Sequence, residues 1–207
     1  MTGLRERKKV DTRRALSDAT LNLAFERGLD NVTREDIADA AGVSLRTFNN
    51  YFRTKYEALA YRQVQRMERS LAVFRERPVD EPLWTAIAES VVEPLAAEGV
   101  AEVAPTHDQL AVIRALVLVP EARLAMFRSL FDDWVVAIAE RTGTDPERDM
   151  YPRMAARVTG AIAEAAMDAY VAADPPVAIT TLFRQGFAAV AAGLPEPTTR
   201  TGGRNHD

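Results

Sequence analysis

The clearest chemical signal in this sequence is a group of polar side chains in SLRTFNNYF, residues 44–52. On a helix through this stretch, Arg46 and Asn50 fall on the face opposite Phe48. Arginine can donate two hydrogen bonds to guanine, and asparagine matches the donor and acceptor that adenine presents in the major groove. The pattern therefore predicts a helix surface that reads base pairs in double-stranded DNA.

Two further residues are suited to the DNA backbone. Tyr51 and Lys55 lie where phosphates would pass, and Lys55 is close to the start of the next predicted helix, where anions are favoured. Leu45 is placed either to contact a thymine methyl group or to pack against its own domain. Short helix pairs also occur in helical proteins with no role in DNA binding, so the spacing alone leaves both interpretations open.

The elements that would position these side chains are two short helices joined by a glycine turn. Thr33 and Asp36 have the spacing of a capping box, which begins a helix. Gly42 can enter the left-handed conformation that ends such a helix. Ser44 can then cap a second helix. This arrangement is a helix-turn-helix.

Residues 33–59, TREDIADAAGVSLRTFNNYFRTKYEAL, resemble the DNA-binding domain of the TetR family of bacterial transcriptional regulators. The SLRTFNNYF segment is similar to an actinobacterial subgroup that includes regulators associated with mycofactocin genes. The positions that fit the family pattern are Thr33, Ile37, Ala38, Ala41, Gly42, Val43, Ser44, Thr47, Phe48, Tyr51, Phe52, Lys55 and Leu59.

The resemblance implies roles for individual positions. Leu45, Arg46 and Asn49 fall where family members read bases. The implied backbone contacts are made by Thr47, Tyr51 and Lys55, with Thr33 and Arg34 near the backbone at the start of the preceding helix. Asn49 replaces the usual aromatic residue, which implies a base preference of its own. The complete predicted DNA-binding set is Thr33, Arg34, Ser44, Leu45, Arg46, Thr47, Asn49, Asn50, Tyr51 and Lys55.

The rest of the chain shows helical periodicity and no sustained alternation typical of strands, which predicts an all-α fold of about nine helices. Three domains are expected: a DNA-binding domain over 1–53, a helical ligand-binding and dimerisation domain over 54–194, and a disordered tail over 195–207. The predicted helices, apart from the short pair, span 10–27, 54–77, 83–98 with a kink or split at Pro94, 105–119, 121–141, 145–172 and 177–192.

Charge and composition restrict the function classes. Residues 1–70 carry 14 Lys and Arg against 10 Asp and Glu, whereas residues 71–207 carry 12 against 20, giving the net charge of −4. A basic N-terminal segment on an otherwise acidic chain is compatible with DNA binding, because the electrostatic potential at the binding surface depends mainly on nearby charges. The chain has no cysteine, no long apolar run and no signal-peptide pattern, which indicates a cytoplasmic protein without disulfides.

The resemblance implies an apolar effector cavity in the second domain and a homodimer built from the last two long helices. Small residues in 156–172 would let helices approach closely and form a four-helix interface. Each cavity candidate is also compatible with an ordinary core position. His107 and Arg114 are the polar candidates, since a buried cation needs an anionic partner. The full candidate set is Trp84, Ile87, Val91, His107, Leu110, Ile113, Arg114, Phe127, Phe131 and Trp134.

The sequence gives an enzyme little support. Its two histidines, His107 and His206, complete no metal-binding pair, and no phosphate-binding loop, dinucleotide fingerprint or nucleophile elbow is present. We therefore expect no catalytic residue, metal or cofactor. The predicted function is a homodimeric repressor released from a palindromic DNA operator by a small, largely apolar effector. An activator, a regulator without a ligand, and a helical binding module that does not bind DNA remain as alternatives.

Overall fold

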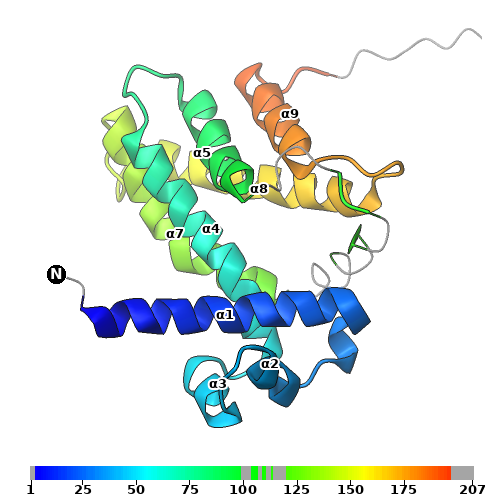
Figure 1. Ribbon diagram of the computed structural model, residues 1–207. Coiled ribbons are helices and arrows are strands. Elements are labelled where there is room, and N and C mark those ends of the chain that lie inside the picture. The colour runs from blue at the N-terminus through cyan, green and yellow to red at the C-terminus, as the bar shows by residue number, and fades with distance from the viewer. Residues whose placement is uncertain (1–2, 99–103, 107–108, 111–112, 114–119, 197–207) are drawn as a thin grey trace, which may run out of the picture.

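The computed structural model describes residues 3–98, 104–106, 109–110, 113 and 120–196, with the side chains of 4–6 and 120–129 left out (Figure 1). Within these ranges the chain forms eight α-helices and one short 3-10 helix, and no described residue lies in a strand. The predicted all-α fold is confirmed. No helix in the described part of the chain is long and apolar enough to cross a membrane.

The N-terminal part consists of a long helix that lies across two short ones (Figure 1). Its elements are α1 (Leu4–Arg27), η1 (Leu29–Asn31), α2 (Arg34–Ala40) and α3 (Leu45–Tyr51). The predicted start of α1 at Val10 is wrong, because the helix already begins at Leu4. Arg, Glu and Lys in this first segment favour helix intrinsically, although they carry no apolar stripe.

The three N-terminal helices share a small apolar core. Leu16 from α1, Ile37 from α2 and Phe48 from α3 are completely buried in it. Phe52 follows α3 and places its ring 6.0 Å from that of Phe48, centroid to centroid. These contacts fix the angle at which α3 leaves the turn, so the exposed face of α3 is set by burial of the opposite face.

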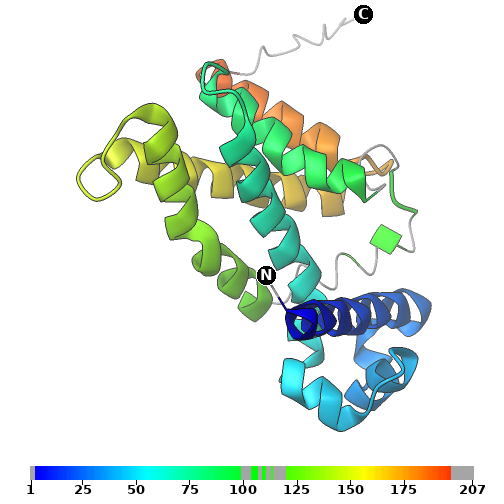
Figure 2. The ribbon, with the colours of Figure 1, turned by 60° about the vertical axis from the view of Figure 1, so that its left-hand side comes forward.

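The helix α4 (Lys55–Glu76) runs from the N-terminal helices into the body of the protein (Figures 1 and 2). Ala58 near its start belongs to the N-terminal core, whereas Leu71 and Phe74 near its end belong to the second core. One rigid helix therefore contributes to both cores. The predicted domain boundary after residue 53 remains a prediction.

The body packs α4 against α5 and α7, and α8 and α9 complete the second core. Its further elements are α5 (Leu83–Ala97), α7 (Pro120–Thr142), α8 (Met150–Ala172) and α9 (Ile179–Ala191). A β-carbon at Gly186 of α9 would lie 2.7 Å from Ile162 Cγ2 of α8. The glycine therefore allows these two helices to pack closely.

Two predicted details of the body are wrong. The helix α5 continues through Pro94 without a split, because the proline removes only its own N–H donor, whereas the predicted kink stays a prediction. The helix α8 begins at Met150, five residues after the predicted start at Asp145. The Asp145 carboxylate instead accepts hydrogen bonds from the N–H groups of Glu147 and Arg148, at 2.8 and 3.2 Å, and so forms a local turn.

The remaining helix boundaries lie close to the glycine and proline residues that predicted them. The helix α1 ends at Gly28 as predicted, and α9 begins two residues after its predicted start. The predicted helix over 105–119 and the tail from residue 197 onward fall mainly or wholly outside the described residues.

Candidate nucleic-acid interface

The turn between α2 and α3 is a Schellman motif. Gly42 has φ of +66°, its N–H donates to the Asp39 carbonyl at 3.0 Å, and the Val43 N–H donates to the Ala38 carbonyl at 2.9 Å. A residue with a β-carbon is strained at this φ. The glycine therefore ends α2 and turns the chain so that α3 can begin three residues later, at Leu45.

The N-terminus of α3 is capped by Ser44. Its Oγ accepts a hydrogen bond from the Thr47 N–H at 3.1 Å and lies 2.9 Å from the Thr47 hydroxyl oxygen. The side chain of Ser44 is therefore already used to start the helix. Any contact of Ser44 or Thr47 with DNA stays a prediction, and it would have to share these hydroxyl groups.

The side chains of α3 divide into a buried face and an exposed face. Phe48 is 0% exposed. Arg46, Asn49 and Asn50 are exposed, and Arg46 makes no hydrogen bond or ion pair with any described residue. The half-buried positions are Leu45, Thr47 and Tyr51. The free guanidinium group of Arg46 is thus available for an external acceptor.

Asn49 is oriented by a residue of the preceding helix. The Arg34 guanidinium donates from Nη1 to the Asn49 side-chain oxygen at 3.2 Å. An arginine side chain has donors only, so its partner must be the carbonyl end of the amide. The Asn49 NH₂ group consequently faces away from Arg34, and two predicted DNA-binding residues are brought together.

Tyr51 is held from α1. The Arg13 guanidinium lies 5.8 Å from the centre of the Tyr51 ring and 5.9 Å from that of Tyr61 on α4. Such cation–π contacts restrict the ring without using its hydroxyl group. The Tyr51 hydroxyl is therefore compatible with the predicted phosphate contact.

The side chain of Lys55 makes contacts within the protein that the sequence did not indicate. Its ammonium group donates to the carbonyls of Leu29 at 2.8 Å, Val32 at 3.0 Å and Asp30 at 3.4 Å. These carbonyls belong to η1 and the residue after it, so the lysine ties the start of α4 to the link between α1 and α2. Its predicted phosphate contact stays a prediction that this geometry does not favour.

Replacing Lys55 with methionine is expected to lower the free energy of unfolding by about 1–3 kcal/mol, because carbonyls at 2.8–3.4 Å lose a charged donor. We expect the salt dependence of DNA binding to stay unchanged, as measured by titrations at several salt concentrations. If the slope of the logarithm of the binding constant against that of the salt concentration fell by about one per half-site, Lys55 would contact a phosphate after all. Arg75→Gln, at an exposed site farther along α4, is the matched charge control.

The capping box predicted at the start of α2 is confirmed. The Thr33 N–H donates to Asp36 Oδ2 at 2.9 Å, and the Asp36 N–H donates to Thr33 Oγ1 at 3.1 Å. The hydrogen bond from the Thr33 hydroxyl, then that from its N–H, then the one from Arg27 lower the pKa of Asp36 from 3.8 to about 2. The carboxylate form is therefore the one that the folded state favours.

This lowered pKa predicts a pH dependence of stability. The contribution of the Asp36 carboxylate is complete above its unfolded pKa and is lost as the pH falls from about 4 toward 2. Denaturant titrations at several pH values should show that Asp36→Asn removes this part of the acid dependence. A slope in this pH range that is identical in the variant and the wild type would contradict the prediction.

The predicted effector-cavity residues lie in the second core as far as they are described. Ile87, Leu110 and Trp134 are buried in that core. Trp84, Val91, Ile113 and Phe131 are half-buried and pack against it. His107, Arg114 and the side chain of Phe127 lie outside the described residues. An effector cavity among these residues stays a prediction.

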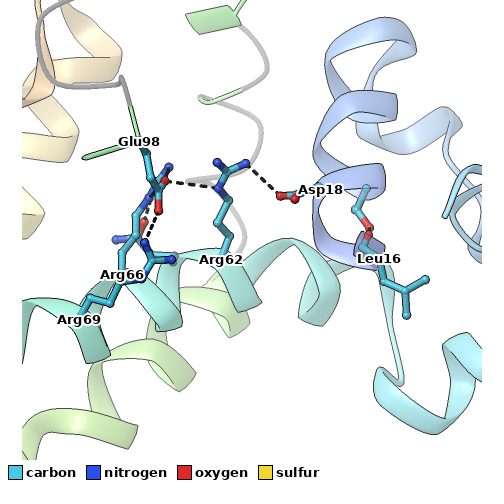
Figure 3. A network of polar contacts seen from close by, with 8 residues as sticks. Leu16, Asp18, Arg62, Arg66, Arg69 and Glu98 are labelled. Atoms are coloured by element: carbon cyan, nitrogen blue, oxygen red, sulfur yellow. Dashed lines mark hydrogen bonds and ion pairs between the residues drawn. The ribbon is translucent and has the colours of Figure 1, made fainter. Parts of the chain in front are cut away.

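Sequence reasoning missed a group of arginines on α4. Arg62, Arg66 and Arg69 follow one another at spacings of four and three residues, which places them on one helix face. Figure 3 shows them around Glu98, the residue that follows α5. The periodicity of the arginines was visible in the sequence, but their distant carboxylate partner was not.

Two segments of the chain match described protein domains. Residues 16–60 match the description "Bacterial regulatory proteins, tetR family", and residues 81–195 match the description "MftR C-terminal domain". The second match covers more than half of the chain and agrees with the subgroup resemblance. No curated protein matches the sequence.

Several solved structures share the fold. A TetR-family regulator from Syntrophomonas wolfei has a TM-score of 0.64 at 15% identity, over 91% of this chain and 98% of the other. The fatty acid degradation regulator FadR of Bacillus halodurans has a TM-score of 0.57 at 19% identity, over 88% and 96%. Thermus thermophilus FadR, a repressor solved with lauroyl-CoA, has a TM-score of 0.58 at 20% identity, over 92% and 99%.

Proposed function

Because the chain belongs to the TetR family of bacterial transcriptional regulators, which are not enzymes, we propose that it is a homodimeric repressor that a small effector releases from its operator. One observation supports DNA reading most strongly. The capped turn presents Arg46 and Asn50 on the face of α3 opposite the buried Phe48, with the exposed Asn49 beside them. A cytoplasmic location is part of the proposal, since the operator is there.

The proposed DNA contacts divide into base reading and backbone holding. Arg46, Asn49 and the half-buried Leu45 read base edges, with Asn50 beside Arg46 on the exposed face. Thr47, Tyr51, Thr33 and Arg34 hold phosphates and fix the register, which is the usual role of contacts that carry no sequence information.

The proposed dimer uses the outer faces of α8 and α9. The side chains of Ala161, Ala165 and Ala169 lie exposed along α8, and Met150 and Met154 extend this face at its start. Small side chains allow a second copy to approach closely, and exposed methionines favour burial. A two-fold protein would place two copies of α3 about 34–36 Å apart, one DNA turn, as a palindromic site requires.

The proposed effector would act by binding the state that does not read DNA more tightly than the state that does. A difference of about 1–3 kcal/mol changes operator affinity 5- to 150-fold. Fatty acyl thioesters of coenzyme A are the compounds to test first, since a structure of the same fold was solved with one of them. Reporter expression with and without the gene for this protein separates repression from activation.

The experiment that tests this function is selection of bound sequences from a random duplex pool, followed by light scattering of the complex. Enrichment of a palindromic site bound by two copies of the chain supports the proposal. Binding that falls steeply with salt but selects no sequence would overturn operator recognition. A selected site without a two-fold repeat would overturn the dimer.

The Arg34–Asn49 hydrogen bond predicts a specific change in base preference. Replacing Arg34 with methionine removes the donor that orients the Asn49 amide. We expect lower base discrimination at one position of each half-site, by about 1 kcal/mol, since each good bidentate pair contributes about 1–3 kcal/mol. The same selection, repeated with the variant, measures it. An equal loss of affinity for all sequences would mean that Arg34 contacts phosphates only.

A further inference from the structure

A cavity of about 260 Å³ lies between α1 and α4, where the N-terminal helices meet the body of the protein. It is separate from the predicted apolar candidates and is lined by polar and charged side chains. Its lining comes from three elements: α1, α4 and the residue that follows α5. A molecule bound here would contact the DNA-binding part and the body at once.

The carboxylates at this cavity are already occupied by arginines (Figure 3). Glu98 is 11% exposed and pairs with Arg66 at 2.6 Å, Arg69 at 3.0 Å and Arg62 at 3.4 Å. Arg62 also pairs with Asp18 of α1 at 3.1 Å. The burial of Glu98 raises its pKa, but the arginines, Arg66 first, outweigh this effect, so that the pKa lies below 4.5. Both carboxylates are therefore already paired with arginines of α4.

Unused hydrogen-bond donors remain on the α1 side of the cavity. Ser17 is 2% exposed, and its hydroxyl has no hydrogen-bond partner among the described residues. Other helical hydroxyls behave differently: Thr20 donates to the Leu16 carbonyl at 2.7 Å, and Ser70 donates to the Arg66 carbonyl at 3.0 Å. Burying a hydroxyl group without a hydrogen-bond partner costs free energy. A ligand with an acceptor atom beside Ser17 would remove this cost.

Two more donors face the same space. Arg14 lines the cavity and forms no ion pair with any described residue. The Tyr61 hydroxyl accepts a hydrogen bond from Gln65 Nε2 at 2.8 Å, which leaves its own proton to donate. Burial raises the pKa of Tyr61 above 10.0, so the phenol stays protonated at neutral pH.

The chemistry of this cavity favours an anion with several acceptor oxygens. Three arginines (Arg14, Arg62 and Arg69) and two carboxylates (Asp18 and Glu98) line the cavity, and Arg66 also pairs with Glu98, which leaves an excess of positive charge. A guanidinium group matches carboxylate and phosphate oxygens in a forked geometry. The volume is below the roughly 300–1,000 Å³ of sites for drug-sized ligands, so it suits a free ion or the head group of a larger molecule.

We propose that this cavity binds an oxyanion, phosphate or carboxylate, through Arg14, Ser17 and Tyr61, and that this anion couples the effector state of the body to the position of α1. The second half of the proposal rests on the proposed function as a ligand-responsive regulator. The coupling follows from the placement of these donors, because Arg14 and Ser17 belong to α1 and Tyr61 belongs to α4, so an anion bound by all three ties α1 to α4. Such a ligand shifts the equilibrium only by its differential affinity for the two arrangements.

Calorimetric titration of the full chain at constant ionic strength tests the binding. The probes are inorganic phosphate, acetate, octyl phosphate and octanoate, with chloride as the reference anion. We expect saturable binding of a phosphate or carboxylate probe that weakens about tenfold in Arg14→Gln and severalfold in Ser17→Ala. Arg75→Gln, which removes an exposed charge from the same helix as Tyr61, should bind as the wild type does.

The probes also separate the two sources of the anion. Equal affinity for the ion and its octyl derivative indicates a free ion, whereas much tighter binding of the octyl derivative indicates the head group of a larger effector. Ser17→Ala should keep or raise the melting temperature, since it removes a hydroxyl without a partner, so weaker binding in this variant does not come from unfolding. The proposal is overturned if no probe binds better than chloride, or if both variants bind as the wild type does.

Operator affinity with and without the bound probe then tests the coupling. A change of fivefold or more, absent in Arg14→Gln, supports it. Unchanged operator affinity at saturating probe would overturn the coupling and leave the binding site intact. Failure to select any operator would overturn the proposed function, but calorimetry would still decide the anion site, so the two failures are distinguishable.

Discussion

Replacing Phe48 with alanine is expected to lower the free energy of unfolding of the N-terminal helices by about 3–5 kcal/mol. Phe48 is 0% exposed and packs with Leu16, Ile37 and Phe52 in a small core. Few other apolar side chains are available to fill the cavity that the substitution leaves. We therefore expect both the stability of these helices and DNA binding to be lost together.

Denaturant titration combined with amide hydrogen exchange measures this effect, because exchange reports the N-terminal helices separately from the body. Phe25→Ala is the matched control, since Phe25 lies on α1 with 37% of its surface exposed. Its cost should be about 1–2 kcal/mol, clearly below that of Phe48→Ala, because part of its ring is already in water. If Phe48→Ala lost less than 1 kcal/mol, the recognition helix would not be held by the N-terminal core.

The local signals of the helix-turn-helix predicted its geometry well, because each of them acts within a few residues. Thr33 and Asp36 form the capping box, Gly42 adopts the left-handed turn, and Ser44 caps α3. The same reasoning predicted that Lys55 contacts a DNA phosphate. Its three carbonyl partners are 23–26 residues away in sequence, and no periodicity indicates them.

The body shows where sequence reasoning ends. Apolar side chains at helical spacing, such as Ile87 and Trp134, are buried in its core, and their spacing cannot distinguish core from cavity lining. The polar cavity depends on Glu98 meeting three arginines that precede it by 29–36 residues in the sequence. Only the packing of α4 against α1 and α5 brings these groups together.

Arg46→Ala is expected to weaken binding to the selected operator by about 1–3 kcal/mol for each half-site and to relax specificity at one base pair. The guanidinium group of Arg46 is exposed and has no partner among the described residues, so the substitution removes no internal contact. The stability of the protein should therefore stay unchanged. A loss of affinity then reports DNA contact alone.

Competition binding against the operator and against single-base variants measures both parts of this effect. Arg46→Lys keeps the charge but not the forked donor geometry, so it should retain the salt dependence while still relaxing specificity. If Arg46→Ala weakened binding to all sequences equally and Arg46→Lys restored the affinity, Arg46 would act as a simple positive charge near phosphates. Unchanged operator affinity in Arg46→Ala would mean that base reading depends on Asn49 and Asn50. The orientation imposed on Asn49 by Arg34 would then become the main determinant of which sequence is bound.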